Sequence, residues 1–118
     1  MGLSGLYSID EIKCKDGGYD IQATIFAGHR VFEGHFPEQP VVPGVCTLTV
    51  VKKALSQACG RPLRYQAIKE CKFLSALIPA EDLKLTIDCS FSDDSILKCT
   101  VACNDTISLK LSATMTDM

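Results

Sequence analysis

The sequence lacks a strong net charge, a long apolar run and the start of a secretion signal. Its formal net charge is only −2, so it has no basic field that would attract a nucleic acid or an anionic membrane. No apolar stretch approaches the roughly 20 residues that span a bilayer. The N-terminal segment also lacks a basic region followed by an apolar one. We therefore expect a cytoplasmic protein with neither a nucleic acid nor a membrane as partner.

A zinc-type cysteine pattern is also missing, although the chain has seven cysteines. None of them forms a CxxC pair, and the closest two, Cys99 and Cys103, fall on one face of a predicted strand. Their number is odd and no export signal accompanies them, which disfavours a disulfide framework. We expect reduced thiols that are mostly small core residues, with no metal site and no cofactor.

The pattern of apolar residues predicts one domain over residues 1–118, a length that can bury a single core. Period-two alternation predicts two strands between residues 6 and 26, around a turn at Asp16-Gly17-Gly18. The same signal predicts strands at about 64–73, 83–91, 95–103 and 106–115. Asn104-Asp105 separates the last two strands. Their covered faces are expected to include Cys99 and Cys103 in the first and Ile107 in the second.

One helix is predicted over residues 44–59. Pro43 suits its first turn, and Gly60 and Pro62 end it. Such a helix is about 24 Å long. Its apolar residues recur at helical spacing: Val45, Leu48, Val51, Leu55 and Ala58. An antiparallel sheet with one face covered by one helix is an α+β fold.

The segment between the second strand and the helix contains three prolines and concentrates the candidate chemistry. Its last part, GHFPEQPVVPGV, indicates a rigid loop that holds His35 near the start of the helix. Free backbone amides and the positive end of the helix dipole bind an oxygen that gains negative charge. A base beside such a site suits proton abstraction next to a thioester carbonyl. An ordinary loop histidine is the alternative, and these residues alone do not decide between the two.

The motif H-F-P-x-x-P-V-x-P-G, followed by an amphipathic helix, resembles the active-site motif of the bacterial β-hydroxyacyl-(acyl carrier protein) dehydratases. Every specified position matches. The later segment CKFLSALIPAEDLKLTID is also similar to the family's strand, turn and pre-strand proline and acid. The resemblance implies a hot-dog fold, in which a curved antiparallel sheet of about six strands wraps one long central helix. It also implies a dimer as the basic unit.

The resemblance implies specific roles within this motif. His35 becomes the catalytic base, the Val41 carbonyl orients its imidazole, and the Gly44 amide donates to the thioester carbonyl. The substrate-binding positions expected around them are Phe36, Pro43, Val45 and Lys53.

The family's second catalytic group is absent from this sequence. The family has Glu or Asp fourteen residues after the histidine, on the partner subunit's helix, and here that position is Thr49. A threonine hydroxyl is a poor match for a carboxylic acid at neutral pH. Lys53, one helical turn later, is either a replacement donor or a solvated charge.

Other groups near the motif are weaker candidates for the missing acid. Glu33 and Glu38 flank His35, but acids in loops are usually only solvated. Cys46 in the first helical turn is expected to be a buried structural residue rather than a thiolate. We assign no role to His29.

The sequence therefore predicts a (3R)-hydroxyacyl-(acyl carrier protein) dehydratase of fatty acid or related acyl-chain biosynthesis, with acyl carrier protein as its partner. One alternative is a catalytically impaired acyl-thioester-binding subunit that pairs with an active homologue, and the other is a hot-dog thioesterase. A homodimer or an assembly of dimers is expected, or a heterodimer with a homologue.

Overall fold

The computed structural model describes residues 5–29, 41–92 and 96–117. Its elements, in chain order, are β1 (Tyr7–Lys15), β2 (Gly18–Ile25), α1 (Gly44–Cys59), β3 (Leu63–Phe73), β4 (Leu83–Phe91), β5 (Ile96–Cys103) and β6 (Thr106–Asp117).

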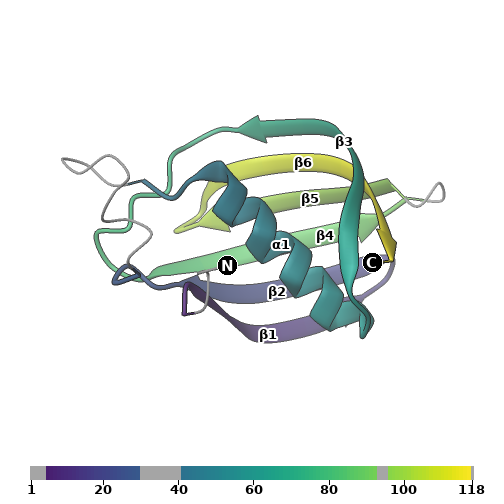
Figure 1. Cartoon of the computed structure of the whole chain (residues 1–118), viewed down its shortest axis with the longest axis horizontal. Coiled ribbons are helices and arrows are strands. Elements are labelled where there is room, and N and C mark those ends of the chain that lie inside the picture. Colours follow the sequence, from purple (N-terminus) through teal and green to yellow (C-terminus); the bar gives the residue numbers. More distant parts are fainter. Residues whose placement is uncertain (1–4, 30–40, 93–95, 118) are drawn as a thin grey trace.

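The six strands form one antiparallel sheet in the order β1-β2-β4-β5-β6-β3. Figure 1 shows this sheet curving around α1, with β3 arching over one side of the helix. The chain passes from β3 at one edge to β4 in the middle through the segment Leu74–Asp82. The predicted α+β class, with one helix wrapped by about six strands, is confirmed.

The core lies between α1 and the concave face of the sheet. Leu85 and Ile87 of β4 belong to the same buried cluster as Val50 and Leu55 of α1, and all four are fully shielded from solvent. Each such side chain contributes about 1.5–3 kcal/mol relative to an exposed one. The strict alternation of buried and exposed residues along β4 follows from the period of two that a one-sided sheet requires.

The predicted helix has the predicted bounds. It ends at Cys59 because Gly60 adopts a left-handed conformation, with φ of 74°, and its amide donates to the Gln57 carbonyl. Pro43 differs from the prediction in one detail, because it is the N-cap rather than a residue of the first turn.

Two strands differ slightly from their predicted limits. The prediction ended the last strand near residue 115 and began the third near residue 64, but pairing of Leu63 with Asp117 lengthens both. Ile107 was expected on the covered face, yet 38% of it is exposed. The register shift between Val101 and Ala102 interrupts the alternation at that point.

All seven cysteines are free thiols. Cys46, Cys89 and Cys99 are buried, as predicted for core residues, whereas Cys14 is exposed. The Cys89 and Cys99 sulfurs, on paired positions of β4 and β5, lie 3.6 Å apart. The pKa of the Cys99 thiol is raised mainly by the hydrogen bond with Cys89 and, to a smaller extent, by burial.

No group of three or more potential metal ligands occurs within the described ranges. The one helix there is also too short and too polar to cross a bilayer.

Gly18, the first residue of β2, gives a test of the sheet. A methyl group added at Gly18 would overlap the Cys89 carbonyl oxygen, whereas one added at Gly28 would meet no atom within 4 Å. We predict that Gly18→Ala lowers the free energy of unfolding by more than about 2 kcal/mol, because β2 and β4 must move apart to make room for the methyl group. Gly28→Ala should change it by less than about 0.5 kcal/mol. Urea unfolding of both variants measures the difference, and equal stabilities would contradict this packing.

Candidate functional site

The segment Leu74–Asp82 holds both described ends of the chain that joins β2 to α1. At one end, the Ala27 amide donates to the Asp82 carboxylate at 2.8 Å. At the other end, the Val42 amide donates to the Leu77 carbonyl at 2.8 Å. The two ends of the motif-bearing connection are therefore fixed to one common segment.

The start of α1 carries backbone amides without a backbone acceptor among the described residues. Its N-cap is Pro43, which makes no side-chain cap, and the first turn contains no acidic residue. The Cys46 amide donates to the Pro43 carbonyl at 2.9 Å. The Gly44 and Val45 amides find no backbone acceptor among the described residues. Such amides, at the positive end of the helix dipole, suit an oxygen that bears negative charge.

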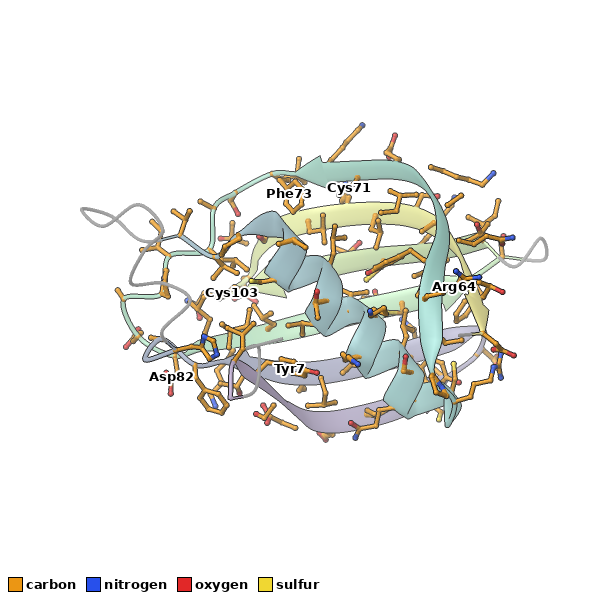
Figure 2. All side chains as sticks on the ribbon, viewed as in Figure 1. Tyr7, Arg64, Cys71, Phe73, Asp82 and Cys103 are labelled. Carbon is orange, nitrogen blue, oxygen red and sulfur yellow. The ribbon has the colours of Figure 1, made fainter. Side chains whose placement is uncertain are left out.

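A cavity of about 410 Å³ opens beside these amides. Its wall is formed by the start of α1, the end of β3 and the segment after β3. An atom added at Gly44 would lie 2.6 Å from the Phe73 ring, so only glycine lets the ring approach the helix this closely. Figure 2 shows Phe73 beside the start of α1. Lining residues include Val41, Val42, Gly44, Thr47, Phe73 and Leu77.

Hydrogen bonds from β3 and β6 hold this wall in place. The Tyr65 hydroxyl donates to the Leu48 carbonyl at 2.6 Å, and burial keeps the pKa of Tyr65 well above its usual range, so it remains a donor. Buried Ser108 donates its hydroxyl to the Ser75 carbonyl at 2.9 Å. These bonds fix the cavity wall relative to α1.

The structure brings together only part of the predicted site. Val41 and Gly44 line the cavity, and Pro43 caps the helix beside it. Val45 does not line it, and 69% of Val45 is exposed. Four predicted candidates lie outside the described residues: Glu33, His35, Phe36 and Glu38.

Thr49 and Lys53 do not line this cavity. They follow Val45 at intervals of four residues, on the side of α1 away from the buried core. The Thr49 hydroxyl donates to the Val45 carbonyl at 2.8 Å, and Lys53 is exposed. Within one chain, the position of the family's acid is therefore separate from the cavity at Gly44.

Cys46 is the buried structural residue that the sequence predicted. Only 2% of it is exposed, and burial raises the pKa of its thiol. A thiolate is disfavoured there despite the nearby helix start.

Several contributors to the cavity were not predicted. Thr47, Ser75 and Ser108 carry no sequence signal, because single hydroxyl residues occur in many helices and strands. Only the pairing of β3 with β6 brings Ser75 and Ser108 together.

A second cavity, also of about 410 Å³, lies near the C-terminal end of α1. It is lined by Tyr19, Cys59, Arg61, Phe91 and Asp117 among others. No predicted site residue belongs to it.

Comparison with known proteins shows that the chain belongs to the class of hot-dog dehydratases. Residues 11–112 match the ApeI-like family, described as ApeI dehydratase. Since this match covers most of the chain, the protein belongs to the ApeI-like dehydratase family.

Two relatives are 3-hydroxyacyl-[acyl-carrier-protein] dehydratases FabZ. The one from Clostridium botulinum is 32% identical over 72 residues, which are 55% of this chain and 50% of the relative. The one from Clostridium kluyveri is 29% identical over 89 residues, which are 68% of this chain and 62% of the relative. The chain thus spans about half to three fifths of the length of these relatives.

A similar solved structure is a chain of the dehydratase heterocomplex ApeI:P from Xenorhabdus doucetiae. It superposes with a TM-score of 0.73 at 20% identity, and covers 92% of this chain and 96% of the other. This likeness confirms the predicted hot-dog fold.

Proposed function

We propose that the protein is a dehydratase of (3R)-hydroxyacyl chains carried by acyl carrier protein, in fatty acid or related acyl-chain biosynthesis. The observation that carries this proposal is the start of α1, where the Gly44 amide has no backbone acceptor among the described residues and Gly44 lines a cavity. In the sequence, this helix start directly follows the His35 motif. Membership in a dehydratase family and similarity to FabZ proteins support it.

In this reaction, the Gly44 amide donates to the thioester carbonyl oxygen, and His35 removes a proton from the neighbouring carbon. The carbonyl oxygen gains negative charge as the proton leaves, so a fixed amide stabilises the transition state more than the substrate. One such donor accounts for about 10²–10³ in rate. The bond to the 3-hydroxyl then breaks, and the hydroxyl leaves as water once it receives a proton.

The proton that the leaving 3-hydroxyl receives can come from this chain or from a partner subunit. The Thr49 hydroxyl already donates to the Val45 carbonyl, so its proton is not directed at a substrate. Threonine is also too weak an acid to protonate a leaving hydroxyl at neutral pH. We therefore infer that a group other than Thr49 supplies the proton. Lys53 and a residue of a partner subunit are the candidates.

A homologous partner subunit is the second candidate role for this chain. The edge strand β3 pairs only with β6 among the described strands, and its outer edge is open. Large apolar side chains are exposed beside it, including Val45, Ile68, Phe73 and Leu74. A chain of the same fold from Xenorhabdus doucetiae forms a dehydratase heterocomplex. These features support a dimer through this side, with a second copy or with a homologue that provides the acid.

The base is tested by replacing His35. We predict that His35→Ala lowers the dehydration of a 3-hydroxyacyl-(acyl carrier protein) by at least about 10²-fold, because general base catalysis is lost. His29→Gln is the matched control and should stay within about threefold of the wild type. The formation of enoyl thioester is followed by absorbance.

Equal inactivity of wild type and His35→Ala, alone and with a co-purified homologue, would contradict the dehydratase proposal. Release of free thiol from an acyl thioester without enoyl product would instead identify a thioesterase.

Thr49 is tested by two opposite substitutions. We predict that Thr49→Val retains activity within about threefold, because the hydroxyl serves only the helix. In a homodimer of this chain, Thr49→Glu should raise the dehydration rate by about 10²-fold, since the second copy then supplies a general acid. Single-turnover rates measure both effects. A tenfold or greater loss in Thr49→Val, with unchanged thermal stability, would show that the hydroxyl takes part in the reaction.

A further inference from the structure

We propose that Asp82 is a positioning residue for the proposed site, because its carboxylate fixes the point at which the motif-bearing connection leaves the sheet. This inference rests on the proposed dehydratase function. It concerns how the fold holds the reacting groups, and Asp82 itself touches none of them.

The geometry begins where β2 and β4 stop pairing. Their final pair is Ile25 with Leu83, so Ala27 and Asp82 lie just beyond the last paired residues of these two strands. There the Asp82 carboxylate takes the place of a backbone acceptor and receives the Ala27 amide at 2.8 Å. Figure 2 shows Asp82 at this end of the sheet. A charged acceptor makes a stronger bond to an amide than a neutral one does.

The segment that carries Asp82 is itself anchored at its other end. The Leu74 amide donates to the Ser108 carbonyl at 2.8 Å, and the Ser75 hydroxyl donates to the Ile107 carbonyl at 3.1 Å. Between these anchors and Asp82, the Leu77 carbonyl accepts the Val42 amide. One segment, tied to β6, thus sets the positions of both Ala27 and Val42.

This arrangement matters because Val42 lies two residues before Gly44, and the connection between Ala27 and Val42 contains His35. A base must stay within hydrogen-bond reach of its proton, and a displacement of about 1 Å can reduce the rate by about 10²-fold. Loss of the Asp82 bond removes the contact that holds Ala27, while the Phe26 amide keeps its bond to the Leu6 carbonyl at 2.8 Å. The cavity lining stays unchanged, because neither Asp82 nor Ala27 lines it. The effect should therefore fall on kcat rather than on KM.

The experiment compares three variants of the full chain, assayed with whichever partner it purifies. We expect Asp82→Ala to lower kcat by about 10- to 100-fold while KM changes by less than about twofold. Asp82→Asn should recover to within about threefold of the wild type, because its amide oxygen still accepts the Ala27 bond. Glu81→Ala, at the neighbouring exposed position, should match the wild type.

Hydrogen exchange of the peptide that contains Ala27 provides a second measurement, independent of activity. The Ala27 amide should be protected in wild type and Asp82→Asn, and should exchange at least tenfold faster in Asp82→Ala. The inference is overturned if Asp82→Ala keeps wild-type kcat, if Asp82→Asn fails to restore it, or if the Ala27 amide is unprotected in the wild type. An inactive wild type with a protected Ala27 amide would instead remove the proposed function and leave the positional role of Asp82 standing.

Discussion

The packing of one amphipathic helix into a curved sheet is the constraint on which the rest of this structure depends. Val50, Ala54 and Leu55 are fully buried against the sheet, which fixes the rotation and depth of α1. Once the helix is fixed, its first residue must lie where β3 ends and the segment Leu74–Asp82 begins. The same burial that stabilises the fold therefore places Gly44 against the cavity, and its amide has no backbone acceptor among the described residues.

Closure of that cavity depends on contacts between distant parts of the sequence. Phe73 can lie against the helix only because residue 44 has no side chain. Ser108 of β6 holds Ser75, and Leu77 holds Val42. The first bond runs from a side-chain hydroxyl to the Ser75 carbonyl, and the second runs from the Val42 amide to the Leu77 carbonyl. The cavity is thus a consequence of sheet order and not of any single motif.

Much of the fold was predictable from the sequence, since alternation and helical spacing report directly on which side of an element is buried. The bounds of α1 were predicted correctly because Pro43 and Gly60 mark both ends. Ile107 was assigned to the wrong side because a register shift in the sheet leaves no trace in residue types. The hydrogen bonds of Ser108 and Asp82 were also missed, because both join segments that are remote in the sequence.

The predicted site divides in the same way. Val41 and Gly44, which the family resemblance named, both line the cavity, and their catalytic roles stay predictions. Thr49 was recognised as a departure from the family, but its hydrogen bond to the Val45 carbonyl could not be predicted from the sequence. Because that bond occupies the only proton of the Thr49 hydroxyl, we expect the proton donor of the proposed reaction to be another group, either Lys53 or a residue of a partner.

If the start of α1 binds a thioester carbonyl, a bound thioester must change the amide chemical shifts of its first residues. A 3-hydroxyacyl pantetheine thioester is added to ¹⁵N-labelled His35→Ala protein, so that ligand binds without turnover. The account predicts the largest shift changes at Gly44 and Val45, with little change at Gly60 and Arg61 near the second cavity. Saturable changes at Gly60 and Arg61, with Gly44 and Val45 unaffected, would contradict it.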